Sequence, residues 1–195
     1  MRRKEGNKEQ DILNAAVEVF ASEGYYPAKI SEIAEKAKIA TGSVYLYFKN
    51  KDEILIKIFE GLWKKIFEQV QTLSLRDDLN PIEKLDAFID VVFDLFTASP
   101  ALALVFVREQ PLILNTKGLK LVQYYDDFLN LGEGLIQSGI DSGDFNKNLN
   151  VNIVKNFTFG GVRYLLHQWA LKPKYFPLNQ VRQDVKFIIK KGLLV

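Results

Sequence analysis

The sequence predicts an all-α protein of about nine helices, and three observations support this fold class. Glycine and proline divide the 195-residue chain into segments in which apolar residues recur every three or four positions. No stretch alternates apolar and polar residues for long enough to indicate a β-sheet. The chain is also long enough to bury a core without a disulfide or a structural metal.

The composition excludes several kinds of functional site. Cysteine is absent, so the chain has no disulfide framework, no thiolate metal site and no thiol nucleophile. The start of the chain lacks the apolar run of a signal peptide, and the longest apolar run, residues 101–107, is too short to cross a membrane. We therefore expect a cytoplasmic location, no membrane partner, no cofactor and no metal.

The first predicted helix covers residues 8–23. Its apolar positions follow the spacing of one helical face, namely Ile12, Ala15, Ala16, Val19 and Phe20. Gly24 follows the last of these positions and ends the helix, because glycine readily adopts the left-handed conformation of a helix C-terminus.

Two short helices, residues 30–37 and 41–48, come next and are joined by a tight link. This arrangement is a helix-turn-helix candidate. A fourth helix begins after Asn50, with Asp52 in the first turn, where the helix dipole favours acidic side chains. Its apolar positions continue to about residue 72.

Five further helices are predicted after a polar connector that ends at Pro81. The helix between Pro100 and Pro111 is short and mostly buried, and the helix over residues 151–171 is apolar on more than one side. The predicted ranges are, in order, 82–98, 100–111, 119–139, 151–171 and 181–193.

The aromatic side chains of residues 41–48 divide between two sides of the helical wheel. Val44 and Phe48 fall together and dock the helix on its neighbours, whereas Tyr45 and Tyr47 point outward with their hydroxyl groups. This division indicates one face for packing and one face for recognition.

The N-terminal end of the same helix suits a DNA major groove, which requires a slim helix end and nearby donors to phosphate. The slim end consists of Thr41, Gly42 and Ser43. The net charge of +2 is too small to indicate nucleic acid by itself, but the basic residues of the stretch 36–51 have no acidic residue among them. The alternative is an ordinary surface helix with aromatic packing, and the wheel alone leaves both open.

Three segments together resemble one known domain. They read ILNAAVEVFASEG (residues 12–24), ISEIAEKAKI (residues 30–39) and GSVYLYFKNKDEIL (residues 42–55). In this order and spacing they resemble the N-terminal domain of the tetracycline-repressor (TetR) family of bacterial transcription factors. The resemblance covers about the first 55 residues, and the rest of the chain agrees with the family only in length and helical layout.

The resemblance implies a helix-turn-helix DNA-binding domain over residues 1–55 and a ligand-binding and dimerisation domain over residues 56–195. By position, the base-reading residues of the family correspond to Ser31, Thr41, Gly42 and Tyr45. The phosphate contacts correspond to Ser43, Tyr45, Tyr47 and Lys51, and Lys29 is a further basic candidate. With few long polar side chains at the reading positions, phosphate contacts and DNA shape are expected to supply much of the affinity.

The linker between the two short helices departs from the family pattern. Lys38 stands where the family generally has glycine, and Ile39 and Ala40 replace the usual valine and serine. We therefore expect Lys38 to adopt a left-handed backbone conformation, at a cost of about 1 kcal/mol.

The second domain is expected to bind a small molecule and to form a homodimer through the last two helices, although burial within a monomer also explains their apolar faces. An effector pocket is expected to draw on the aromatic and charged residues of the helical core. The candidates are Phe93, Phe96, Phe106, Arg108, Tyr125, Phe128, Phe157, Tyr164 and His167, with Tyr124, Phe159 and Trp169 as further aromatic positions. An aromatic residue at helical spacing is more often plain core, and Arg108 either holds an anionic group, points outward or pairs with an acidic residue.

The effector class is suggested by two stretches. YLYFKNKDEIL and the loop GIDSGDF (residues 139–145) look similar to the TetR branch that responds to fatty acyl-coenzyme A (acyl-CoA). A multidrug-responsive repressor of an efflux system is the alternative. An enzyme is not expected, because His167 is the only histidine and has no cysteine or second histidine to build a site. A purely helical interaction module is the third class, and it would not bind DNA.

Overall fold

The protein was analysed as a computed structural model that describes residues 8–115 and 120–194. Within these residues it forms nine α-helices and one isolated β-bridge, between Phe145 and Leu194, so the all-α prediction is confirmed. The helices are α1 (Lys8–Glu23), α2 (Ile30–Lys36), α3 (Thr41–Val44), α4 (Lys51–Ser74), α5 (Pro81–Thr97), α6 (Pro100–Leu114), α7 (Lys120–Asp141), α8 (Val151–Leu171) and α9 (Leu178–Leu193).

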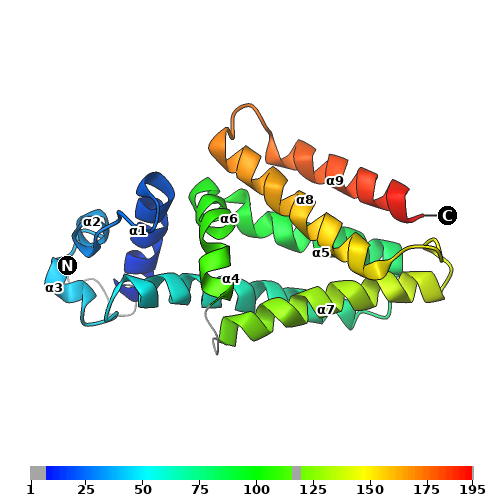
Figure 1. Cartoon of the computed structure of the whole chain (residues 1–195), viewed down its shortest axis with the longest axis horizontal. Helices are drawn as coiled ribbons and strands as arrows, with labels where there is room; N and C mark the ends of the chain where they lie inside the picture. Colours follow the sequence, from blue (N-terminus) through cyan, green and yellow to red (C-terminus); the bar gives the residue numbers. More distant parts are fainter. Residues whose placement is uncertain (1–7, 116–119, 195) are drawn as a thin grey trace.

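Helices α1 to α3 form a small unit at one end of an elongated molecule (Figure 1). Helix α4 starts in this unit and runs beneath the other helices, side by side with α7, while α8 and α9 pair on the opposite side. The buried side chains of both ends belong to one continuous core. The predicted domain boundary after residue 55 therefore lies inside α4, a helix that both parts share.

Side-chain caps start four of the helices as the sequence suggests. Asn50, Asn80, Ser99 and Asn150 each accept a hydrogen bond from the backbone N–H three residues later. A cap of this kind satisfies one of the amide groups that a helix leaves unpaired at its start. No single helix among the described residues is long and apolar enough to cross a bilayer.

The third helix is shorter than predicted. Its α-helical part ends at Val44, and the backbone N–H groups of Tyr47 and Phe48 both donate to the Val44 carbonyl, so residues 45–47 form a turn. The turn keeps Phe48 buried, as predicted for Phe48 and Val44. The packing assignment from the wheel is therefore confirmed, although the helix itself stops early.

The predicted end of the sixth helix at Pro111 is wrong, because α6 continues through Pro111 to Leu114. Proline lacks the N–H that would bond to the carbonyl four residues earlier, which here belongs to Val107. Arg163 of α8 replaces that donor, since its Nη2 lies 2.7 Å from the Val107 oxygen. A contact from a distant helix thus keeps the proline within α6.

Lys38 has φ of 57°, which confirms the left-handed conformation expected at this position. The Lys38 N–H donates to the Glu35 carbonyl, and the Ile39 N–H donates to the Ala34 carbonyl. These two bonds are the pattern of a Schellman motif, which ends α2 and sets the direction of α3.

The loop between α7 and α8 is fixed by the close approach of Phe145 to Gly139. Phe145 is 1% exposed, and its N–H donates to the Gly139 carbonyl at 2.8 Å. A Cβ at position 139 would lie 2.2 Å from the Phe145 ring, closer than any real contact. Glycine is therefore required on this side of α7.

We predict that Gly139→Ala lowers the free energy of unfolding by about 1–3 kcal/mol, because the new methyl group overpacks the Phe145 site. Gly134→Ala is the matched control on the same helix, where an added Cβ meets no atom within 4 Å. The control is expected to leave stability unchanged or to raise it by about 0.5–1 kcal/mol. Urea unfolding at one protein concentration measures both, and equal midpoints for the two variants would contradict the packing described.

Candidate functional site

Seven of the eight predicted recognition residues lie in or beside α2 and α3. Five of them are exposed and two are partly buried. The exposed residues are Lys29, Ser31, Thr41, Gly42 and Tyr45, and the partly buried ones are Ser43 and Tyr47. The structure therefore brings these seven predicted residues together at the end of the molecule where the helix-turn-helix lies.

Lys51, the eighth predicted residue, has a different role in the structure. Its Nζ donates to three backbone carbonyls, those of Tyr25, Tyr26 and Ala28, at 2.7, 2.6 and 3.0 Å. An ammonium group has three N–H donors, so none is free for a phosphate. The prediction of a phosphate contact by Lys51 does not fit the free protein, because the amine instead holds the turn after α1 against the start of α4.

Tyr25 strengthens the same connection. Its hydroxyl donates to the Asp52 carboxylate in the first turn of α4, and the Lys51 amine lies 4.8 Å from the centre of its ring. Burial and the bond to Asp52 raise the pKa of Tyr25 above its usual value, so the phenol stays protonated and remains a donor. The turn and the first residues of α4 are therefore joined by several bonds.

Three exposed side chains beside this surface were not selected from the sequence. Tyr26 is 75% exposed and Leu46 is 82% exposed, and Lys49 is also exposed. Leu46 lies in the turn directly after α3, between Tyr45 and Tyr47, with most of its side chain in solvent. That exposure is the signal that adds Leu46 to the surface.

A cavity of about 80 Å³ lies between α5, α7, α8 and α9. Its lining is almost entirely apolar, with Lys155 and Thr158 as the polar exceptions. The Lys155 side chain is 17% exposed, and its Nζ lies 2.6 Å from the Glu133 carboxylate of α7. The remaining lining is formed by Leu85, Phe88, Ile89, Val92, Phe93, Phe128, Leu129, Gly132, Leu135, Ile136, Val154, Phe159, Val162, Ile189 and Leu193.

Among the predicted pocket residues, Phe93, Phe128 and Phe159 line this cavity. Phe96, Phe106 and Tyr125 do not, because they belong to a solid aromatic cluster beside it. Trp63 of α4 is the centre of that cluster, with ring centroids of four neighbours within 6.5 Å. Phe96 and Phe106 are buried, as the plain-core alternative expects, whereas Tyr125 is partly buried.

Four other predicted pocket residues also lie outside the cavity lining. Phe157 and Tyr164 are 75% and 63% exposed on the outer face of α8, so in the single chain they face solvent and not the cavity. His167 lies further along α8 and is partly buried. Arg108 reaches the first helical unit, where its Nη1 donates to the Ala21 carbonyl of α1 at 3.1 Å.

Most of the true lining residues were missed, although α5 carried a signal for them. Leu85, Phe88, Ile89 and Val92 follow the spacing of one apolar face. That face is identified by periodicity, but periodicity does not show where neighbouring helices leave space.

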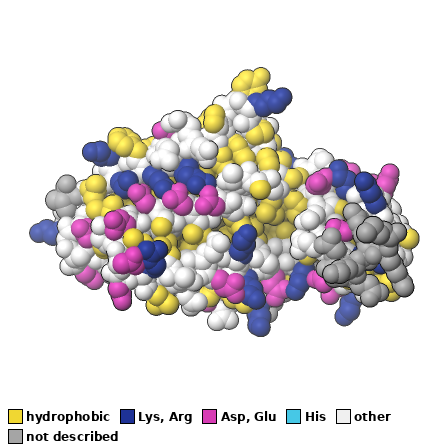
Figure 2. All heavy atoms as spheres, turned by 180° about the vertical axis from the view of Figure 1, so that it is seen from behind, with side chains coloured by type: hydrophobic (Ala, Val, Ile, Leu, Met, Phe, Trp, Pro, Cys, Tyr) yellow, Lys and Arg dark blue, Asp and Glu magenta, His cyan; other side chains and the backbone are white. Residues whose placement is uncertain are grey.

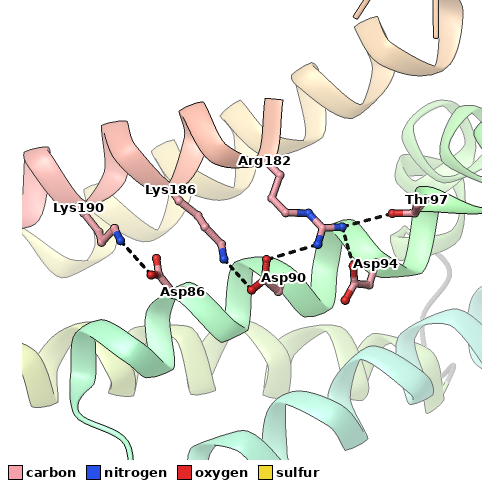
Figure 3. A network of polar contacts seen from close by, with 7 residues as sticks. All are labelled: Asp86, Asp90, Asp94, Thr97, Arg182, Lys186 and Lys190. Carbon is pink, nitrogen blue, oxygen red and sulfur yellow. Dashed lines mark hydrogen bonds and ion pairs between the residues drawn. The ribbon is translucent and has the colours of Figure 1, made fainter. Parts of the chain in front are cut away.

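Helix α9 closes the cavity and is fastened to α5 by a ladder of ion pairs (Figure 3). Three basic residues spaced four apart on α9 pair with three acidic residues spaced four apart on α5. The pairs are Lys190 with Asp86 at 2.9 Å, Lys186 with Asp90 at 2.6 Å, and Arg182 with Asp90 at 3.5 Å and Asp94 at 2.5 Å. On the face seen in Figure 2, a row of basic side chains runs beside a row of acidic ones.

Comparison with known families gives two adjoining matches. A family model described as "Bacterial regulatory proteins, tetR family" matches residues 12–58, and one described as "YsiA-like protein, C-terminal region" matches residues 59–192. The chain belongs to the TetR family. The resemblance of the first 55 residues is therefore confirmed, and the second domain is of the YsiA-like type.

Individual relatives of this TetR-family chain agree with that assignment. The fatty acid metabolism regulator protein of Bacillus subtilis (strain 168) is 30% identical over 189 residues, which is 95% of each chain. The solved structure of the fatty acid degradation regulator FadR from Bacillus halodurans has a TM-score of 0.78 and 28% identity, with 96% of each chain covered.

A crystal structure of the transcriptional regulator FadR from Bacillus subtilis in complex with stearoyl-CoA matches with a TM-score of 0.75 and 30% identity. It covers 94% of this chain and 98% of the other. These relatives are transcription regulators, and the chain is likewise a DNA-binding regulator and not an enzyme.

We predict that Lys51→Met lowers the free energy of unfolding by about 1.5–3 kcal/mol, because three carbonyls lose a charged donor. Lys49→Met is the matched control, since Lys49 is exposed two residues earlier. The control is expected to keep its stability and to reduce the slope of log K against log salt for DNA binding by about 1. If Lys51→Met is as stable as the unmodified protein in urea unfolding, the three carbonyl bonds contribute little, and Lys51 is again a candidate for a phosphate contact.

Proposed function

We propose that the protein is a repressor that binds a palindromic operator as a homodimer and is released by a fatty acyl-CoA. The observation that carries the effector part is the apolar cavity between α5, α7, α8 and α9 in a chain whose relative binds stearoyl-CoA. The N-terminal unit to about residue 55 reads the DNA, and the helices beyond it sense the ligand and form the dimer.

The DNA contacts follow from the exposed surface of α2 and α3. Thr41 and Gly42 open α3 and meet base edges in the major groove, together with Ser31 and Tyr45. Phosphate contacts come from the hydroxyl groups of Ser43 and Tyr47 and from the exposed amines. Because the reading side chains are short, sequence-dependent DNA shape contributes strongly to the choice of operator.

The dimer is supported by apolar side chains on the outer faces of α8 and α9. These side chains are between 45% and 75% exposed in the single chain, which is unusual for so many large apolar residues on two adjacent helices. They are Ile153, Phe157, Tyr164 and Leu171 on α8 and Phe187 and Ile188 on α9. Between Phe157 and Tyr164 lie Gly160 and Gly161, where an added Cβ would meet no atom within 4 Å, so a partner helix can approach closely.

The chemistry of the cavity lining suits an acyl chain better than a cationic drug. In the part of the chain that the structure describes, the cavity lining contains one cation, Lys155, and no acidic residue. A buried cationic ligand needs a compensating negative charge, whereas an acyl chain needs only apolar surface. The multidrug-responsive alternative is therefore less well supported.

Two routes connect the cavity with the DNA-binding unit. Helix α7 lines the cavity and packs along α4, whose first turn is bonded to the turn after α1. Helix α8 also lines the cavity, and Arg163 contacts the α6 backbone one residue before Arg108, which contacts α1. A ligand that moves α7 or α8 therefore changes the separation of the two recognition helices, which must lie about 34 Å apart for adjacent major grooves. By linkage, bound DNA lowers the affinity for the ligand by the same factor by which the ligand lowers the affinity for DNA.

The function is tested by fluorescence anisotropy with duplexes selected from a randomised pool. We expect salt-dependent binding to a palindrome, release of the DNA by stearoyl-CoA and no release by coenzyme A alone. The same titration with acyl-CoA of several chain lengths shows which chains the cavity accepts. Release by cationic dyes but by no acyl-CoA would support the multidrug alternative, and absence of DNA binding would contradict the regulator itself.

We predict that Phe157→Glu converts the protein to a monomer at micromolar concentration, because two charges are forced into the apolar contact of the two-fold dimer. Leu75→Glu is the matched control, since Leu75 is also 75% exposed but follows α4 and belongs to neither α8 nor α9. Sedimentation velocity distinguishes the states. A dimeric Phe157→Glu variant, or a monomeric unmodified protein, would contradict this interface.

A further inference from the structure

A second hollow adjoins the effector cavity. It is an open groove of about 620 Å³ between α4, α5 and α7. Phe88 of α5 and Leu135 of α7 line both the groove and the cavity, so these two side chains form the wall between them. The cavity and the groove are therefore neighbours that are separated by the thickness of one layer of side chains.

Neither hollow alone suits an acyl-CoA. The cavity is apolar but holds only about 80 Å³, whereas sites for small molecules usually offer about 300–1,000 Å³. The groove falls within that range, but polar side chains form much of its lining. A ligand with an apolar chain and a long polar arm needs both.

The polar lining of the groove consists mainly of neutral donors and acceptors. They are Gln71, Ser74, Asn130 and Ser138. The two charged residues, Lys84 and Asp127, are opposite in sign, and the Lys84 amine already donates to the Ser74 carbonyl at 2.9 Å. This chemistry matches the amides and the hydroxyl of a pantetheine arm better than an isolated carboxylate, which needs a free cation.

Phe88 occupies the space through which a chain would pass from one hollow to the other. Its ring is partly buried and lies 5.0 Å from the Phe128 ring, centroid to centroid. On its other side is Gly132, where an added Cβ would lie 3.4 Å from the Phe88 Cζ. Because position 132 has no side chain, only the backbone of α7 lies against this side of the ring.

We propose that Phe88 is a movable partition, with the acyl chain of the ligand in the cavity and its pantetheine arm in the groove between α4, α5 and α7. This inference rests on the proposed acyl-CoA effector and adds the place of its polar part. It also places the arm against α4, the helix that carries the DNA-binding unit.

The partition is tested by the association rate of stearoyl-CoA in stopped-flow fluorescence. Phe88→Ala is expected to raise the rate about tenfold by opening the wall, and Gly132→Ala to lower it by a similar factor by blocking the ring. Gly61→Ala is the matched control, an exposed helix glycine whose added Cβ meets no atom within 4 Å. A faster association of Phe88→Ala would not be explained by a loss of stability alone. If Phe88→Ala does not fold, Gly132→Ala still tests the inference. Equal association rates in Gly132→Ala, Gly61→Ala and the unmodified protein would show that Phe88 is not a movable partition.

The groove is tested by equilibrium titration with stearoyl-CoA and with stearate, which has the same chain without the arm. Asn130→Leu is expected to lower the affinity for stearoyl-CoA about tenfold, equivalent to about 1.4 kcal/mol, and to leave the affinity for stearate unchanged. If Lys155→Met lowers the affinity for stearoyl-CoA and Asn130→Leu does not, the pantetheine arm leaves the cavity between α7 and α8. The inference about the groove is then wrong, but the proposed acyl-CoA effector is still supported. If stearoyl-CoA does not bind the unmodified protein, both the effector and this inference are wrong.

Discussion

The architecture depends on α4 being held by two different sets of interactions along its length. At its start, the Lys51 amine and the Asp52 carboxylate bond to the turn after α1. Near its middle, Trp63 packs among aromatic rings of α6, α7 and α8. One helix therefore belongs both to the DNA-binding unit and to the core beside the cavity, and it is the direct connection that the proposed coupling uses.

Helices α8 and α9 take part both in the cavity and in the proposed dimer contact. They line the cavity with one face and expose apolar side chains on another, so an occupant and a dimer partner act on the same two helices. The ladder from Arg182, Lys186 and Lys190 to α5 keeps α9 over the cavity. The side chains of Arg182 and Lys186 are 14% exposed, whereas their partners Asp90 and Asp94 are 37% and 66% exposed, so solvent reaches these ion pairs from the acidic side and screens them in part.

The fold was largely predictable because its determinants are local. Helix ranges followed from periodicity, and caps such as Asn50 followed from residue type. The left-handed conformation of Lys38 was expected from the resemblance, because Lys38 stands where the family generally has glycine. The errors occurred where a distant residue decides: Pro111 remains helical because Arg163 replaces the missing donor, and the Lys51 amine is used by carbonyls more than 20 positions earlier in the chain.

The sequence by itself determined the helical class and the helix-turn-helix, because these depend on spacing within short segments and on a motif of adjacent residues. Only the tertiary structure decided which aromatic residues surround a cavity and which form solid core. Phe93 and Phe96 lie on the same helix and are equally buried, yet only Phe93 lines the cavity. An empty space is a property of several helices packed together, and no periodicity within one helix records it.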